Sequence, residues 1–202
     1  ALVMIFNQNE TPYSPSGIRN AIEAMKLQIP MMSEQPRYLI GFKNGVYDLS
    51  LKVFRAHQAA DWLQNHNGIY FTNPNPNENL TQHAPHFTRW LSHVANHDEL
   101  KASRIKAALF MILSNRFDWQ LFIEVTGEGG SGKSIFTHIA TLLAGQQNTA
   151  SGNMATLDQA RGRAQFVGKS LITLPDQVKY VGEGAGIKAI TGGDLVEIDG
   201  KY

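Results

Sequence analysis

The residues best suited to chemistry in this sequence are a glycine-rich run, GEGGSGKS, that ends in lysine and serine. The run fits the pattern G-x-x-x-x-G-K-[ST] of a phosphate-binding P-loop. Glycine lets the backbone turn tightly and approach oxygen atoms, and successive N–H groups then form a nest for anionic phosphates. The residues predicted to bind a nucleoside triphosphate are Gly127, Glu128, Gly129, Gly130, Ser131, Gly132, Lys133 and Ser134.

Two side chains of this loop have separate predicted roles. Lys133 is expected to reach the β- and γ-phosphates of ATP as a catalytic residue, and the Ser134 hydroxyl to ligate Mg²⁺. The apolar run Leu121–Thr126 predicts a strand before the loop, and Lys133–Leu143, followed by Gly145, predicts an amphipathic helix after it. The alternative is a merely flexible glycine-rich loop, which this strand–loop–helix context disfavours.

A second acidic group is needed to hold the magnesium ion through its water shell. The apolar run Ser170–Leu174 predicts a strand, and Pro175 and Asp176 follow it directly. We therefore expect Asp176 to act as a metal and catalytic residue, the alternative being a strand-end aspartate that caps a turn. Gln177 stands where many ATPases have a glutamate that polarises the attacking water, which argues against full catalytic competence.

The C-terminal segment is a candidate for binding single-stranded DNA. Leu195–Ile198 alternates weakly in hydrophobicity, as one arm of a hairpin would, and Lys201 and Tyr202 would then lie toward its tip. A lysine and an aromatic side chain at a loop tip can pair with a phosphate and stack on a base. An ordinary solvated turn is the alternative.

Other segments must position these groups. Ser14 and Pro15 are typical of a helix start, Asn-Gly between apolar runs indicates a hairpin, and Thr156 begins a possible capping box. The other elements expected are a short buried strand at Leu2–Phe6, a helix at Pro15–Leu27, hairpin strands at Arg37–Phe42 and Val46–Leu49, a third strand at Leu51–Arg55, a loop at Asn73–Asn79, and helices at His86–Asn96, Ala102–Asn115, Leu157–Gln165 and Gly184–Ile190.

The bulk properties are those of an ordinary globular protein. The chain has 202 residues, 43% hydrophobic and 17% charged, with a net charge of +1, so whole-chain charge does not argue for nucleic acid or membrane. The absence of cysteine excludes disulfides and thiolate metal sites. No apolar run is long enough for a membrane span. Both ends of the chain suggest a fragment of a longer protein.

Several further residues have alternative interpretations. His93 and His97 are spaced to bind a metal from one helix, but a polar helix edge is the better account because nothing completes the site. Trp90 on the same helix is expected in the core rather than as a platform for a base. Arg161 and Arg163 could contact a phosphate, but as surface charges on a short helix they are expected to be solvated.

The order of these motifs resembles that of superfamily 3 helicases, and most closely that of the phage and plasmid primase-helicases and the poxvirus primase-helicase. FKNGVYDL at residues 42–49 resembles a signature of the helical domain that precedes their ATPase core, and RGRAQFVGKSL at 161–171 resembles the segment between their nucleotide motifs. The residues that match the base of their channel hairpin are Lys188, Thr191, Gly192, Gly193 and Asp194.

This resemblance implies an ATP-driven DNA helicase of phage or plasmid replication, with ATP and Mg²⁺ as cofactors. The parent protein would form a homo-hexamer in the cytoplasm of a bacterial host and make no membrane contact. Lys188, Lys201 and Tyr202 would contact single-stranded DNA in its channel. The family's sensor asparagine and arginine finger would follow Tyr202, so hydrolysis by this chain itself is not implied.

The expected fold is therefore α/β. Residues 1–116 are expected to form a mainly helical domain with a β-hairpin, and residues 117–202 the first part of a truncated, AAA+-like P-loop NTPase core. One alternative is a non-catalytic prophage remnant or assembly module. Another is a different P-loop enzyme such as a nucleotide kinase, which is disfavoured because a kinase lid needs phosphate-gripping arginines and only Arg161 and Arg163 are candidates.

Overall fold

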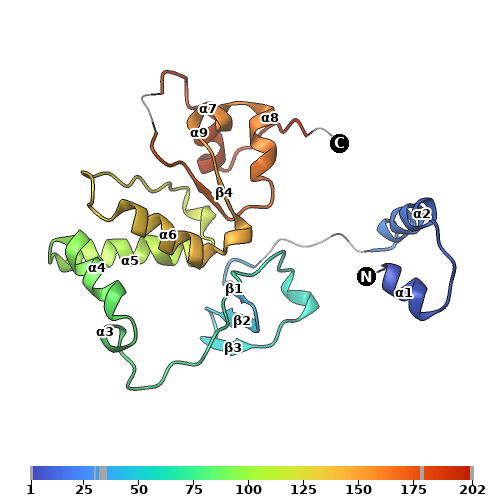
Figure 1. Cartoon of the computed structure of the whole chain (residues 1–202), viewed down its shortest axis with the longest axis horizontal. Coiled ribbons are helices and arrows are strands. Elements are labelled where there is room, and N and C mark those ends of the chain that lie inside the picture. The colour runs from blue at the N-terminus through green and yellow to red at the C-terminus, as the bar shows by residue number, and fades with distance from the viewer. Residues whose placement is uncertain (1, 30, 32–35, 178–179, 201–202) are drawn as a thin grey trace. The chain divides into compact units, whose positions relative to one another are not determined.

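The computed structural model of the chain describes residues 2–29, 31, 36–177 and 180–200, and it mixes helices with two small sheets (Figure 1). The strands are β1 (Leu39–Phe42), β2 (Gly45–Asp48), β3 (Val53–Arg55), β4 (Thr149–Ser151) and β5 (Leu171–Thr173). The α-helices are α1 (Leu2–Gln8), α2 (Pro15–Lys26), α3 (Leu80–His83), α4 (Pro85–Ala95), α5 (Glu99–Leu113), α6 (Lys133–Ala144), α7 (Met154–Asp158), α8 (Ala160–Arg163) and α9 (Ala185–Gly192). In the described residues, no helix is long and apolar enough to cross a membrane.

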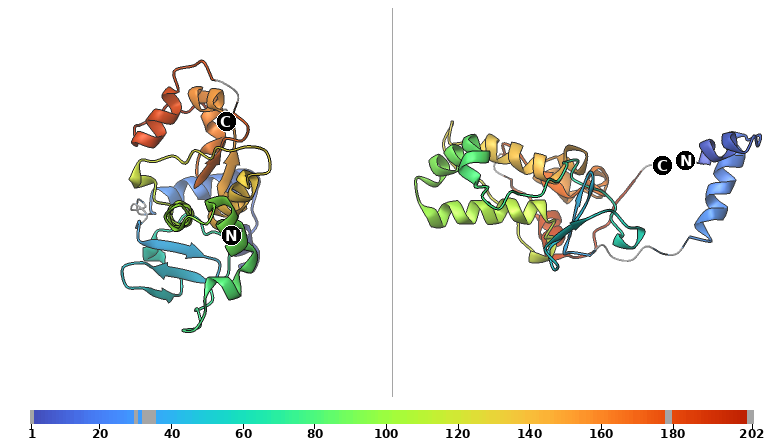
Figure 2. Two further views of the ribbon diagram at one scale, coloured as in Figure 1. Left: turned by 90° about the vertical axis from the view of Figure 1, so that its left-hand side faces the viewer. Right: turned by 90° about the horizontal axis from the view of Figure 1, so that it is seen from below.

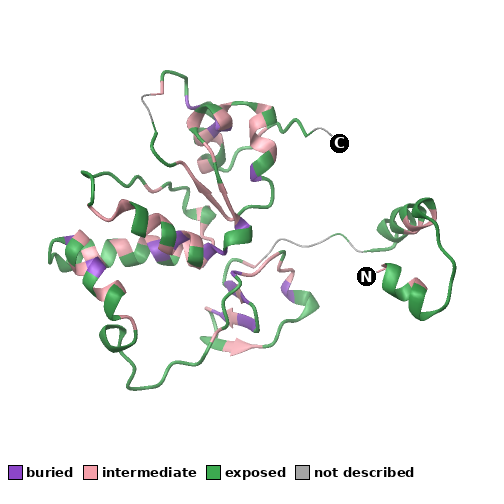
Figure 3. Cartoon of the chain, viewed as in Figure 1, coloured by how far each residue is buried: buried purple, intermediate pink, exposed green. Residues whose placement is uncertain are grey.

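The chain divides into two compact units, Ala1–Glu34 and Gln35–Tyr202. The first contains α1 and α2, neither of which has a buried residue (Figure 3). The predicted helix at Pro15–Leu27 is confirmed, with Ser14 Oγ accepting the Gly17 N–H at 3.0 Å as its cap. The expected boundary between residues 116 and 117 stays a prediction.

The predicted strand at Leu2–Phe6 is wrong, because these residues lie in α1. A strand needs a neighbouring strand to satisfy its backbone groups, and the described part of this unit offers none. A helix satisfies them locally instead, and the Asn9 N–H continues the pattern by donating to Ile5 O at 3.1 Å.

The second unit begins with the three-stranded antiparallel sheet, and both hairpin strands are confirmed. Phe42 lies opposite Gly45, so Lys43 and Asn44 form the turn, one residue earlier than the Asn-Gly pair predicts. Gly45 instead lies where β3 comes close, since a Cβ there would be 2.4 Å from Arg55 O. The expected third strand also forms, beginning at Val53.

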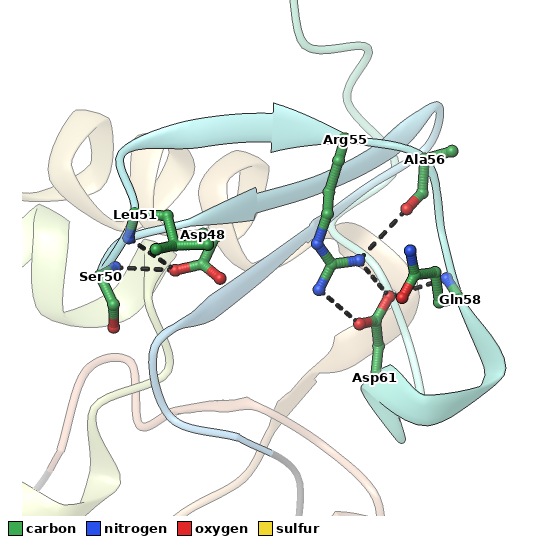
Figure 4. A network of polar contacts seen from close by, with 7 residues as sticks. All are labelled: Asp48, Ser50, Leu51, Arg55, Ala56, Gln58 and Asp61. Atoms are coloured by element: carbon green, nitrogen blue, oxygen red, sulfur yellow. Dashed lines mark hydrogen bonds and ion pairs between the residues drawn. The ribbon is translucent and has the colours of Figure 1, made fainter.

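Two buried carboxylates in this sheet region accept hydrogen bonds from their neighbours (Figure 4). The Arg55 guanidinium donates to both carboxylate oxygens of Asp61, at 2.9 and 2.6 Å, and the Gln58 N–H donates to Asp61 at 2.8 Å. The hydrogen bond from Arg55 lowers the pKa of Asp61 below its usual value. Asp48 is also buried, and its carboxylate accepts the N–H groups of Ser50 and Leu51 in the turn toward β3.

The helices α4, α5 and α6 form the main core of the second unit. In Figure 1 they lie between the three-stranded sheet and the segment α7–α9, and they remain adjacent in both views of Figure 2. The predicted helices at His86–Asn96, Ala102–Asn115 and Lys133–Leu143 are thereby confirmed. Their apolar faces meet in a cluster formed by Trp90, Leu91, Leu109, Phe87, Val94, Ala102, Ile105, Phe136, Ile139 and Leu143.

The second sheet pairs β4 with β5 in parallel, and the crossover between them contains α7 and α8. The predicted strand at Ser170–Leu174 is confirmed as β5, and the predicted helix at Gly184–Ile190 as α9. Strand β4 has no signal in the sequence, because its three residues, Thr-Ala-Ser, form no apolar run.

The single helix predicted at Leu157–Gln165 is wrong in its start and its continuity. Asn153 caps α7 by accepting the Thr156 N–H at 2.8 Å, so the helix begins before the expected capping box. The chain then leaves helical geometry at Gln159 before α8. The side chain of Asp158, the last residue of α7, accepts hydrogen bonds from partners at and before the start of α9, and these long-range contacts are not evident from the local sequence.

Two predicted strands next to the candidate sites do not form. Leu121–Thr126 has no regular structure, and Leu121 and Phe122 are 62% and 63% exposed. Leu195–Ile198 is likewise irregular, held by bonds from Arg163 Nε to Glu197 O and from Asp199 N to Ala160 O. In both cases a strand would need a pairing edge, and the described residues of each segment bond to no strand.

Candidate nucleotide-binding site

Residues 127–134, which we call the glycine-rich loop, lead directly into α6. The helix begins at Lys133, and Gly132 is its N-cap residue with φ 88°. That left-handed conformation favours glycine. Thr126 to Gly130 are exposed, and a Cβ at Gly129 or Gly130 would meet nothing within 4 Å. The tip of the loop is therefore open to a ligand.

Lys133 folds back over the loop that precedes it. Its ammonium group donates to Gly127 O at 2.6 Å and Glu128 O at 2.8 Å, and it approaches Ser131 Oγ at 3.4 Å. These three contacts fix a positive charge at the mouth of the loop. A phosphate bound there would meet the ammonium in place of the carbonyl groups, with the stronger bonds of a charged acceptor.

The first turn of α6 supplies further donors. The Phe136 N–H makes the first intrahelical bond, to Gly132 O at 3.1 Å, so the N–H groups of Lys133, Ser134 and Ile135 have no partner within the helix. Such unpaired donors and the helix dipole favour an anion at this end. The loop sequence and this geometry together fit a phosphate group.

The residues expected to hold magnesium are Ser134 and Asp176, and their oxygen atoms suit that ion. Ser134 is exposed at the second position of α6. Asp176 follows β5 with φ 45° and is also exposed. Among the residues described, no hydrogen bond or ion pair joins Asp176 to Lys133 or Ser134, so the structure does not bring these three together directly.

Gln177 has a structural role that the sequence does not indicate. Its side-chain oxygen accepts the Met154 N–H at 3.1 Å, and its amide nitrogen donates to Pro175 O at 2.8 Å. The side chain thus ties the segment after β5 to the start of α7. This agrees with a glutamine that holds the strand end instead of activating water.

The loop is supported from α4. Trp90 is buried, and its indole Nε1 donates to Gly132 O at 3.4 Å. A Cβ at Gly132 would lie 2.8 Å from Trp90 Nε1 and 2.8 Å from Val94 Cγ1. The expectation that Trp90 belongs to the core is confirmed, and the structure adds a polar contact to the loop that sequence reasoning missed.

Asp158 is a second residue that sequence reasoning missed. Its carboxylate accepts the Tyr180 hydroxyl and the N–H groups of Gly184 and Gly186, the latter at 2.7 Å. These bonds lower the pKa of Asp158, the Tyr180 hydroxyl most of all. They hold the start of α9, where a Cβ on Gly186 would lie 2.1 Å from Leu157 O.

The candidate DNA residues lie apart from the loop in the chain. Lys188 is exposed on α9, and Thr191 to Asp194 form the end of that helix and its cap instead of the base of a hairpin. The glycine pair stops the helix there, with Gly193 as the left-handed cap at φ 80°. Lys201 and Tyr202 lie outside the described residues.

His93 and His97 do not lie on one helical face. Helix α4 ends at Ala95, and His97 has φ 59°, so it leaves the helical face that His93 occupies. His97 Nδ1 instead lies 2.9 Å from Ser92 Oγ. Within the described parts of the chain, no group of three or more potential ligands is placed to hold a metal ion.

Arg163 is not simply solvated. Its Nη1 donates to Leu157 O at 2.8 Å and its Nε to Glu197 O at 2.8 Å, so the guanidinium joins α7 to the segment after α9. These two bonds make it a structural residue.

Comparison with known families adds an independent observation. Residues 6–96 match the D5 N terminal like family. This family is the N-terminal region of phage and viral D5-type primase-helicase proteins, so the match supports a primase-helicase-type replication protein. The match includes FKNGVYDL and Trp90, and it ends at Asn96, the C-cap of α4. The glycine-rich loop lies outside it.

Proposed function

We propose that this chain binds MgATP at the glycine-rich loop and is part of an ATP-dependent DNA helicase of superfamily 3 from phage or plasmid replication. The observation that carries the proposal is the loop itself. The Lys133 ammonium contacts the carbonyl groups of Gly127 and Glu128, and the N–H groups of the first turn of α6, which begins at Lys133, have no partner within the helix. The family match in the preceding segment supports a replication protein of this type.

In this proposal each residue has one task. Lys133 neutralises the β- and γ-phosphates, Ser134 ligates Mg²⁺, and Asp176 orders the water shell of the ion. The Glu128–Ser131 stretch contributes backbone N–H groups. The bound ion would supply charge neutralisation at the phosphates, and the chain's own residues bind and orient the nucleotide.

Calorimetry with MgATP tests the nucleotide site. Wild-type chain is expected to bind, and Lys133→Ala to bind at least about 10-fold more weakly, because a charge-assisted contact is lost. Lys106→Ala is the matched control, an exposed lysine on α5 that should leave affinity unchanged. Equal binding heats from wild type and Lys133→Ala would refute the assignment.

The DNA role needs its own measurement. We propose that Lys188, Lys201 and Tyr202 bind single-stranded DNA, and anisotropy of a labelled oligonucleotide over a salt series tests this. Each lost phosphate contact should reduce the slope of log affinity against log salt by about 0.7. An unchanged slope in the double variant Lys188→Ala and Lys201→Ala would remove the proposal, with Lys106→Ala again as control.

Assembly follows from the same proposal. Superfamily 3 motors place nucleotide between subunits, so a hexamer is proposed for the whole protein. Sedimentation with and without MgATP, on wild type and Lys133→Ala, measures it. A species that stays monomeric with saturating nucleotide would favour a non-catalytic module.

A further inference from the structure

Trp90 and the glycine-rich loop are about forty residues apart in the sequence, yet the Trp90 side chain contacts the carbonyl oxygen of Gly132. Trp90 lies on α4 and packs in the core, with its ring 5.6 Å from that of Phe87. Its only polar atom, Nε1, faces Gly132 O. Burial of an indole N–H is costly without an acceptor, so this contact sets how the loop can sit on α4.

The carbonyl that Trp90 contacts controls the direction of an N–H group in the loop. Gly132 O also accepts the Phe136 N–H at 3.1 Å, so two donors hold it on the helix side. The peptide bond between Gly132 and Lys133 is planar and trans, so its C=O and N–H point in opposite directions. Holding the carbonyl toward α4 therefore aims the Lys133 N–H away from α4, toward the space where a phosphate would lie.

The packing around Gly132 leaves little freedom for this peptide to rotate. A Cβ on Gly132 would lie 2.8 Å from both Trp90 Nε1 and Val94 Cγ1, so the backbone already touches α4 there. By contrast, Gly129 and Gly130 face open space. One end of the loop packs against α4, whereas a side chain added at its tip would meet open space.

We infer that Trp90 is a positioning residue for phosphate binding, acting through the Gly132 carbonyl, and that nucleotide at the loop and the packing of α4 are coupled through this contact. The inference rests on the proposed function, since it concerns the same loop. It assigns to the segment that matches the D5 N terminal like family a direct part in the nucleotide site.

The test uses Trp90→Phe, which keeps a ring in the core and removes the N–H donor. Calorimetry should give MgATP affinity about 5-fold weaker than wild type, the effect of one neutral hydrogen bond. Trp119→Phe is the matched control, because Trp119 is 40% exposed and stacks on Arg116, and its affinity should equal that of wild type. Circular dichroism reports whether each variant is folded.

A spectroscopic measurement separates positioning from a purely structural role. In the variant Trp62→Phe/Trp119→Phe, Trp90 is the only tryptophan, and its emission should shift on addition of MgATP. The shift should be absent after Lys133→Ala in the same background. If Trp90 only packed in the core, its emission would not change when MgATP binds.

The outcomes are distinguishable. If wild type gives no binding heat, the proposed function fails and this inference falls with it. If wild type binds and Trp90→Phe binds equally well, the inference alone is overturned. Should Trp90→Phe not fold, the emission of Trp90 decides, and an emission unchanged by saturating MgATP overturns the inference.

Discussion

The three-stranded sheet and the glycine-rich loop differ in how their polar groups are hydrogen-bonded. In the sheet region the buried carboxylates of Asp48 and Asp61 each accept bonds from neighbouring donors. In the loop region the first-turn N–H groups of α6 have no helical partner, and Leu121, Phe122 and Val125 before the loop are exposed. The buried carboxylates of the sheet region thus have their hydrogen-bond partners within the chain, whereas the N–H groups at the start of α6 are available to a ligand.

This contrast distinguishes a region that stabilises the fold from a region that we propose binds a ligand. Hydrogen bonds to a buried carboxylate avoid the cost of leaving that charge unpaired. Leaving donors unpaired at a helix start costs stability and creates an anion site. The loop itself is attached to the helical core, since α4 contacts Gly132 and α6 follows the loop.

The largest effect should come from breaking the ion pair of the sheet region. Asp61→Asn leaves Arg55 without its carboxylate, and we expect a loss of about 3 kcal/mol in the free energy of unfolding, measured in urea. Glu23→Gln removes one partner of an exposed pair with Lys26 and should cost under about 0.5 kcal/mol. MgATP affinity should stay unchanged in Asp61→Asn; a large fall would mean that the two regions are not separate.

A smaller effect is expected at the fixed end of the loop. Gly132→Ala should cost about 2 kcal/mol of stability, because alanine disfavours φ 88° and its Cβ would crowd Trp90 and Val94. Calorimetry should show MgATP binding weakened as well. Gly129→Ala is the matched control, with nothing near its Cβ. Equal stability of the two variants would mean that α4 does not hold the loop.

Lowering the pH should reduce the contribution of Asp61 to the free energy of unfolding. The pKa of Asp61 is lowered in the folded chain, so its contribution is complete above the ordinary carboxyl pKa of about 4 and is lost as pH falls through the depressed value. The gap in urea midpoint between wild type and Asp61→Asn should therefore stay constant down to about pH 4 and narrow as the pH falls further, through the depressed pKa of Asp61. A gap that does not narrow below about pH 4 would show that the Asp61 carboxylate does not cause it.

The smallest effect on stability is expected for a substitution in Leu121–Thr126, the segment before the loop. Phe122→Ser replaces a side chain that is 63% exposed, so the free energy of unfolding should change by less than about 0.5 kcal/mol. The buried Leu109→Ala is the contrasting variant and should cost about 3 kcal/mol. A cost above about 1 kcal/mol for Phe122→Ser would indicate that Leu121–Thr126 is packed in solution, as its sequence predicts.

Local signals predicted the elements that depend on neighbours in the chain. The Ser14-Pro15 start of α2, the stripes of α4, α5 and α6, and the apolar run of β5 all have the expected form, because caps and helical spacing act within a few residues. The failures share a cause. Leu2–Phe6 and Leu121–Thr126 read as strands, but a strand depends on a partner elsewhere in the chain.

The residue types of the candidate site follow from the sequence alone: a glycine-rich loop with Lys133 and Ser134 at the start of a helix, and an aspartate after a strand. The support of the loop depends on the tertiary structure, which brings Trp90 on α4 to Gly132. Elsewhere in the fold, long-range contacts likewise let Asp158 hold the start of α9 and Arg55 pair with Asp61. The reason is physical: residue types fix which bonds a group can make, whereas the fold fixes which distant groups come within reach to make them.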